Sequence, residues 1–186
     1  MKKYDLDEKS WVIQDDLPQM QYDFEQLWSL HPEKLGQIKI YNRLINTPRW
    51  TQCYGKSYGF SGILHEAMEL PEEFEQFKIW ANSLGFGTFD QILINWYQDG
   101  NHYIGTHADN EPQIVKNSAI LSISLGAERT FRIRSKYTNE VINNIAMTDK
   151  SYVVMGGEMQ KHFTHEVPKV ANSGKRINIT FRIFKK

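Results

Sequence analysis

Cysteine and long apolar runs are both scarce in this sequence. Cys53 is the only cysteine among 186 residues, so no disulfide can form within the chain and a reducing compartment is expected. No apolar run reaches the length of a membrane span, and no signal-peptide pattern follows residue 1. We therefore expect an intracellular monomer without a membrane partner, cytoplasmic if it is bacterial and nuclear if it is eukaryotic.

The chain also lacks net charge, because 22 lysine and arginine residues balance 22 aspartate and glutamate residues. A balance of zero argues mildly against a nucleic-acid binder. The charges are unevenly distributed, however: residues 1–33 carry 8 acidic and 3 basic residues, whereas residues 34–186 carry 14 and 19. A basic body behind an acidic leader is compatible with phosphate contacts, and an ordinary mixed surface explains the same charges equally well.

The length of 186 residues favours a single domain, 1–186. Residues 1–20 are expected to form an extended or partly ordered arm, and amphipathic spacing predicts helices at 22–30 and 71–84. Short strands separated by turn residues are typical of a sandwich or jelly roll, so we expect an α+β, mainly β fold. The predicted strands are 91–98, 102–106, 119–125, 129–134, 141–145, 151–155, 162–166 and 176–184.

A histidine and an aspartate one residue apart, His107 and Asp109, are the first candidates for chemistry. In an extended strand the side chains at i and i+2 face the same way, so both would enter one space. With a second histidine they form the 2-His-1-carboxylate set that binds Fe(II). Residues 161–168 offer His162 and His165, which would face opposite sides of a strand. The H-x-D spacing by itself is a weak signal, because most such pairs are surface accidents.

The last predicted strand alternates polar and apolar side chains. Arg176, Asn178, Thr180 and Arg182 share one face, and isoleucine and phenylalanine fill the other. A half-exposed strand would alternate in the same way. If this face is inside the fold, however, its two arginines need anionic partners, and a small dicarboxylate would supply them.

In this order the motifs resemble the AlkB family of Fe(II)/2-oxoglutarate dioxygenases. The resemblance implies a double-stranded β-helix, or jelly roll, with N-terminal helices. It also implies a nucleotide-recognition hairpin lid at 36–62 and a catalytic core at 90–186, which follow the arm and helix expected at 1–35. The resemblance covers about residues 38–186 and rests on Asn95-x-Tyr97, His107-x-Asp109-x-Glu111, His165 and Arg176-x-Asn178-x-Thr180-x-Arg182.

The resemblance implies that Fe(II) is bound by three catalytic residues, His107, Asp109 and His165. The family histidine precedes a segment like Glu166-Val167-Pro168, which favours His165 over His162. Because ligating imidazoles must be neutral, we expect metal binding to weaken below about pH 6.

The co-substrates that the resemblance implies are O2 and 2-oxoglutarate. Arg176 is expected to bind the far carboxylate of 2-oxoglutarate, since a bidentate guanidinium does this best. Arg182 is expected near the carboxylate on the iron side. Neutral hydrogen bonds to the co-substrate are expected from Asn95, Tyr97, Asn178 and Thr180.

A nucleobase pocket under the lid is also implied. Tyr41 stands where related enzymes place a wedge into the base stack, and Arg49 is expected to contact phosphate. An alkylated base is flat and cationic, so we expect it to stack between Phe60 and the ring of His107, with Tyr58 at the border. The alternative is an ordinary hairpin with core aromatics.

Glu111 follows Asp109 by two residues, and in the family an acidic residue here meets the exocyclic amine of the target base. The implied function is oxidative demethylation of N1-methyladenine and N3-methylcytosine in DNA, with release of formaldehyde. Two alternatives within the family chemistry are an RNA demethylase and an oxygenase that acts on protein or a small molecule. A catalytically silent nucleic-acid-binding module is an alternative of another class.

Overall fold

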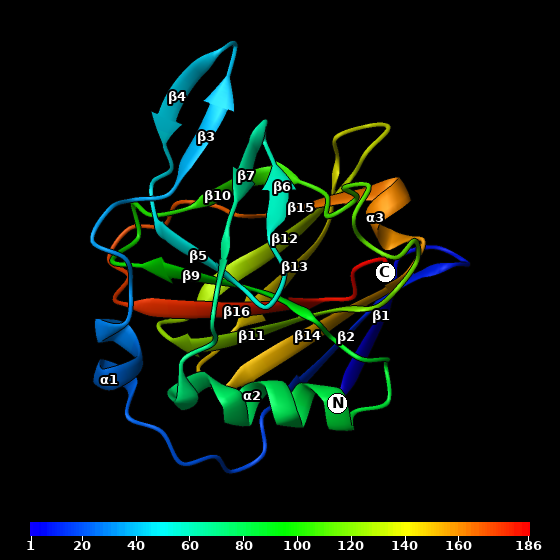
Figure 1. The fold of residues 1–186 in the computed structure, drawn as a ribbon. Coiled ribbons are helices and arrows are strands. Elements are labelled where there is room, and N and C mark those ends of the chain that lie inside the picture. The colour runs from blue at the N-terminus through cyan, green and yellow to red at the C-terminus, as the bar shows by residue number, and fades with distance from the viewer.

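Two facing β-sheets form the body of the protein (Figure 1). The computed structural model describes the backbone of residues 1–186 and every side chain except that of Ile40. The larger sheet has eight strands in the order β1-β2-β14-β11-β16-β9-β5-β8, and the smaller has four in the order β10-β15-β12-β13. The mainly β class predicted from the sequence is therefore confirmed.

The bounds of the elements are as follows. The larger sheet contains β1 Lys2–Asp5, β2 Ser10–Asp16, β5 Trp50–Tyr54, β8 Ala67–Met68, β9 Gln91–Tyr97, β11 Ile120–Gly126, β14 Ser151–Gly157 and β16 Arg176–Arg182. The smaller sheet contains β10 Ile104–His107, β12 Arg129–Ser135, β13 Val141–Met147 and β15 Phe163–Val167. Two separate hairpins are formed by β3 Gln37–Ile40 with β4 Arg43–Asn46, and by β6 Tyr58–Phe60 with β7 Ile63–His65. The helices are α1 Phe24–Ser29, α2 Glu72–Ser83 and α3 Met159–His162.

The two helices predicted from periodicity, α1 and α2, pack on the larger sheet (Figure 1). α2 begins after Pro71, with glutamates in the first turn, where the partial positive charge of the helix stabilises them. Phe74 and Phe77 bury its apolar face in the core that this layer shares with the sheet. None of the described helices has the length and apolarity needed to cross a membrane.

The alternation predicted for the last strand, β16, sorts its side chains between two layers. Ile177, Ile179 and Phe181 belong to the core on the helix side of the sheet. The other face lines a cavity between the two sheets, so both faces of the strand are buried. The residues on the cavity face are Arg176, Asn178, Thr180 and Arg182.

The N-terminal segment differs from the expected arm, because β1 and β2 extend the larger sheet. β2 pairs with β14 along seven residues, and β1 pairs with β2. Val12 is fully buried, and the Trp11 ring lies over Gly156, where a Cβ would come within 2.0 Å of the ring. The acidic composition concealed the short alternating pattern of these strands. Gly156 leaves room for the Trp11 ring because it has no side chain.

The region around the candidate metal ligands also differs from the expected strands. β10 ends at His107, so Asp109 lies beyond the strand rather than within it. The segment before His165 forms the one-turn helix α3, which contains His162. His162 and His165 therefore lie on different elements. The alternation of side chains along a strand does not by itself place Asp109 beside His107.

Candidate active site

A cavity of about 410 Å³ opens between the two sheets. The larger sheet contributes the polar faces of β9 and β16, the smaller sheet contributes β10 and β15, and the β6–β7 hairpin covers one side. Every residue predicted for metal, 2-oxoglutarate or base binding lines this cavity except Tyr41. Those residues are Arg49, Tyr58, Phe60, Asn95, Tyr97, His107, Asp109, Glu111, His165, Arg176, Asn178, Thr180 and Arg182.

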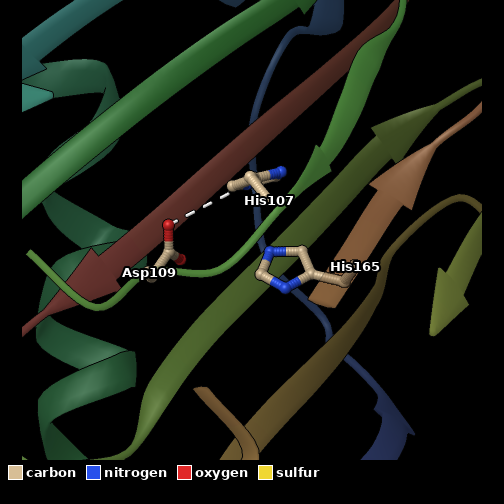
Figure 2. A group of neighbouring side chains, drawn as sticks. All are labelled: His107, Asp109 and His165. Atoms are coloured by element: carbon tan, nitrogen blue, oxygen red, sulfur yellow. Dashed lines mark ion pairs between the residues drawn. The ribbon is translucent and has the colours of Figure 1, made fainter. Parts of the chain in front are cut away.

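Three side chains from two segments meet at the cavity wall (Figure 2). His107 and His165 are directly paired across β10 and β15, with ring centroids 4.3 Å apart. The Nε2 of His107 lies 3.9 Å from Oδ1 of Asp109, and one ligand atom from each of the three residues lies within 4.8 Å of the others. Two imidazoles and a carboxylate at this separation fit one Fe(II) ion bound on a single face.

The electrostatics keep two of these ligands free of protons. Burial lowers the pKa of His165 to about 3, and the nearby His107 adds to the effect. Burial alone would raise the pKa of Asp109, but the Arg182 guanidinium and the two imidazoles lower it to about 2. A neutral imidazole and an ionised carboxylate are the forms that bind metal, so both groups are in the binding form at neutral pH.

This lowered pKa predicts how the metal-free protein responds to acid. Between pH 6.5 and about 3, the unfolded chain binds a proton at His165 that the folded chain does not. The free energy of unfolding therefore falls as pH falls through this window, by up to about 1.4 kcal/mol per pH unit from this group. Denaturant melts across pH 4–7 should show a steeper slope in the wild type than in His165→Gln. Identical slopes would contradict the burial of a neutral imidazole.

His162 is bound elsewhere. Its Nδ1 lies 2.6 Å from the Tyr137 hydroxyl, and its Nε2 lies 2.9 Å from Oε2 of Glu158. Both ring nitrogens are thus engaged by surface residues. The structure accordingly brings His165 to the other two ligands and leaves His162 out.

Arg176 is a buried cation in the cavity wall with hydrogen-bond donors that the described residues leave unpartnered. Its side chain is 2% exposed and lies 5.0 Å from the centroid of the Tyr97 ring. Nη2 donates to Oγ of Ser124 at 2.7 Å, whereas Nε and Nη1 have no partner among the described residues. Buried guanidinium donors without acceptors are costly, so Arg176 needs an anion in the cavity, and a carboxylate can supply it. The site therefore fits the far carboxylate of 2-oxoglutarate.

Arg182 is more closely tied to the metal ligand than we expected. Its Nη2 donates to Oδ2 of Asp109 at 3.1 Å, and Nη1 donates to Oε1 of Gln91 at 3.1 Å. The guanidinium also lies 4.9 Å from the centroid of the Tyr58 ring. Its first role is therefore to orient Asp109, and only Nε is without a partner among the described residues.

The neutral residues expected around 2-oxoglutarate mainly hydrogen-bond other groups of the protein. Asn178 donates from Nδ2 to Ser122 Oγ at 2.7 Å and to the Ile123 carbonyl at 2.8 Å, while its Oδ1 accepts from Thr180 at 3.1 Å. The ring of Tyr97 lies beside the guanidinium of Arg176. These groups form a rigid polar wall, so their first contribution is to shape the cavity.

Arg49 does not face solvent, where we expected it to contact phosphate. Arg49 is 6% exposed, and its guanidinium points inward, to Oδ1 of Asn95 at 2.9 Å and to the Tyr103 carbonyl at 3.1 Å. Oδ1 of Asn95 also accepts from Thr51 at 2.9 Å. The reason is topological: Arg49 immediately precedes β5, which pairs with β9 and turns this side chain into the space between the sheets.

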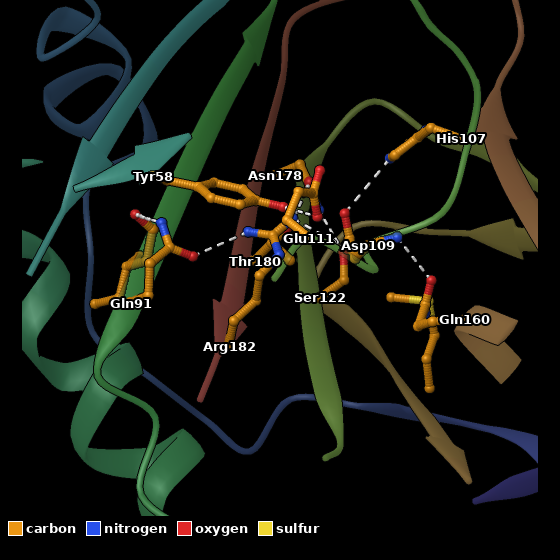
Figure 3. Close-up of polar contacts among 12 residues, drawn as sticks. Tyr58, Gln91, His107, Asp109, Glu111, Ser122, Gln160, Asn178, Thr180 and Arg182 are labelled. Carbon is orange, nitrogen blue, oxygen red and sulfur yellow. Dashed lines mark hydrogen bonds and ion pairs between the residues drawn. The ribbon is translucent and has the colours of Figure 1, made fainter. Parts of the chain in front are cut away.

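Tyr58 of the β6–β7 hairpin points toward Glu111, beside Asp109 and Arg182 (Figure 3). Tyr58 is buried, and its hydroxyl donates to Oε2 of Glu111 at 2.6 Å. Burial raises the pKa of Tyr58, so it stays a donor at neutral pH. Phe60 lies parallel to the ring of His65, with centroids 3.9 Å and planes 9° apart. One face of Phe60 is thus already covered, and Phe60 also lines the cavity.

Tyr41 stands apart from the cavity, at the tip of the β3–β4 hairpin. Tyr41 and Asn42 are the two turn residues, with φ of 46° and 62°, as a two-residue hairpin turn requires. Tyr41 is 97% exposed. The hairpin predicted from the sequence is present, and its apex carries the expected aromatic ring.

Several residues around the cavity were not identified from the sequence. Gln91, Gln160 and His65 each contact a predicted site residue, respectively Arg182, Asp109 and Phe60. None carries a motif. Gln91 is the only one that a sequence signal could have revealed, because it begins a strand that is otherwise apolar up to Asn95.

Comparisons with known proteins agree with this geometry. A family model described as the 2OG-Fe(II) oxygenase superfamily matches residues 7–182. The human DNA oxidative demethylase ALKBH2 is 27% identical over 159 residues, which cover 80% of this chain and 61% of the human protein. The rat alpha-ketoglutarate-dependent dioxygenase alkB homolog 3 is 35% identical over 104 residues, or 51% of this chain and 35% of that protein.

The alignment with the human protein therefore spans about three fifths of its length. Among solved structures, that of OsALKBH1 superposes with a TM-score of 0.58 at 17% identity, covering 86% of this chain and 90% of the other. At this identity the match supports the fold alone, and it agrees with the expected jelly roll.

Proposed function

Because the chain belongs to the AlkB family within the 2OG-Fe(II) oxygenase superfamily, we propose that it is a dioxygenase that removes methyl groups from alkylated nucleobases in DNA. The proposed substrates are N1-methyladenine and N3-methylcytosine. Overall, each turnover would convert 2-oxoglutarate and O2 to succinate and CO2, and the methyl group would leave as formaldehyde. Fe(II) and 2-oxoglutarate, when bound, supply the oxidising chemistry, and the protein supplies binding and geometry.

The observation that carries the proposal is the position of Glu111. Its carboxylate lies in the same cavity as Asp109, and Tyr58 holds one of its two oxygens. The other oxygen is available to an exocyclic amine. A carboxylate in a partly dry pocket attracts a base that methylation has made cationic, by a few kcal/mol relative to a neutral base. Glu111 thus supports selection of a damaged base.

The lid supports the same proposal. The side of Phe60 away from His65 offers an aromatic face to a flat cation. The rings of His107 and Phe60 line the same cavity, which is consistent with a base held between them. A protein or small-molecule substrate would not need the aromatic ring that Tyr41 exposes at the tip of the β3–β4 hairpin.

Formaldehyde release from oligonucleotides that carry each methyl lesion tests the proposal. DNA and RNA strands, single and paired, should be compared with and without 2-oxoglutarate. We expect release that depends on 2-oxoglutarate and on the lesion, with DNA preferred. Release from RNA alone would favour the RNA demethylase. Turnover of 2-oxoglutarate without any active nucleic acid would favour the protein or small-molecule oxygenase.

Tyr41→Ala should separate duplex from single-strand activity. Inserting a side chain into a duplex offsets an unstacking cost of a few kcal/mol, so the variant should lose roughly 10-fold or more on duplex and little on single strands. Ile79→Ala is a matched control, since Ile79 is also an exposed apolar residue, at 68%, but lies on α2. An equal loss on both substrates would refute the wedge.

A further inference from the structure

The three candidate metal ligands are held in two different ways. His107 and His165 are opposite each other in the ladder between β10 and β15, so the sheet fixes their separation. Asp109 lies two residues beyond the end of β10, where that ladder no longer holds the backbone (Figure 2). The position of the carboxylate must therefore come from side chains around it.

Two side chains hold Asp109 (Figure 3). Arg182 binds its carboxylate, as described above. Gln160 holds its backbone, because Oε1 of Gln160 accepts the Asp109 N–H at 2.9 Å. Asp109 is only 5% exposed, so water is a poor substitute for this acceptor.

The side-chain amide of Gln160 has a partner at both its oxygen and its nitrogen. Its Nε2 lies 3.3 Å from Sδ of Met155, a buried residue on β14. Its own backbone carbonyl accepts from Nζ of Lys136 at 3.2 Å. The side chain is thus held in one orientation, with its oxygen directed at Asp109.

Gln160 connects the segments that carry two of the candidate metal ligands. Gln160 is on α3, which leads directly into β15, the strand that carries His165. One hydrogen bond therefore joins the segment of Asp109 to the segment of His165. We propose that Gln160 is a positioning residue for the metal, which keeps the Asp109 carboxylate in place relative to the two imidazoles.

Mn²⁺ binding to the whole chain, measured without substrate, tests this role. Gln160→Leu removes the acceptor at similar volume and should weaken Mn²⁺ binding by roughly 10- to 100-fold, as outer-shell changes usually do. Gln160→Glu keeps an oxygen in place and should retain most of the affinity. Gln14→Leu is the control, because Gln14 also makes two side-chain hydrogen bonds, to Tyr4 and Ala146, and none of these three residues lines the cavity.

The results separate a positioning role from a structural one. If Gln160→Leu binds Mn²⁺ as the wild type does, or if Gln160→Glu loses as much as Gln160→Leu, the proposal fails. Hydrogen exchange of the wild-type Asp109 amide gives a second measurement if Gln160→Leu does not fold. Slow exchange is expected, and exchange at the rate of an exposed amide would overturn the proposal.

Discussion

His165→Ala should abolish turnover and most metal binding, whereas His162→Ala should retain most of both. His165 is one of three ligands that meet within 4.8 Å, and it is 5% exposed. Without it the ion keeps only His107 and Asp109 from the protein. We expect turnover to fall by roughly 1,000-fold or more, since the metal supplies the chemistry.

His162→Ala is the matched control, because both changes remove an imidazole from neighbouring positions of one segment. His162 bonds Tyr137 and Glu158 at the surface, so its loss should affect local stability alone. Turnover and Mn²⁺ titration should be measured on both variants, with circular dichroism to confirm folding. Equal losses in the two variants would show that the ligand assignment is wrong.

Arg176→Met should raise the KM for 2-oxoglutarate by roughly 100-fold or more. The far carboxylate would lose its charged hydrogen bonds, each worth about 1.5–3 kcal/mol. The methionine keeps the apolar stem of the side chain and removes only the charge and the donors. The KM for methylated DNA should change far less, and metal affinity without 2-oxoglutarate should change little. Steady-state kinetics with each substrate varied in turn measures this.

Arg129 gives the comparison for this experiment. It also lies beside the Tyr97 ring, at 5.7 Å, but it donates to the backbone carbonyls of Asp99, His102 and Pro168. Arg129→Met should therefore lower the melting temperature and leave the KM for 2-oxoglutarate near that of the wild type. If Arg176→Met leaves that KM unchanged, Arg176 does not bind the co-substrate.

The parts of the site that the sequence predicted are those in which a strand dictates side-chain direction. In β16 the two-residue period alone places Arg176 and Arg182 on one face, and the structure shows that face in the cavity. The same rule paired His107 with Asp109, although Asp109 lies past the end of β10. That grouping holds because Arg182 and Gln160 position the aspartate, which no local pattern records.

The parts that the sequence did not predict depend on tertiary context. Whether Arg49 faces solvent or the interior depends on how β5 pairs with β9. The short helix α3 has too few residues to show a period, so His162 was predicted in a strand and Gln160 was not assigned to any element. The strands at residues 2–16 were hidden by their acidic composition, because edge strands need only a few buried side chains.

The fully buried strand β16 has a consequence for how the protein can change. Because its side chains alternate between the helix layer and the cavity, sliding the strand by one residue would exchange the two sets. Arg176 and Arg182 would then enter the apolar layer, and Ile177 would enter the cavity. Misregistered chains should therefore fail to fold rather than accumulate as inactive protein. Folded protein should therefore have β16 in the correct register, with Arg176 and Arg182 in the cavity.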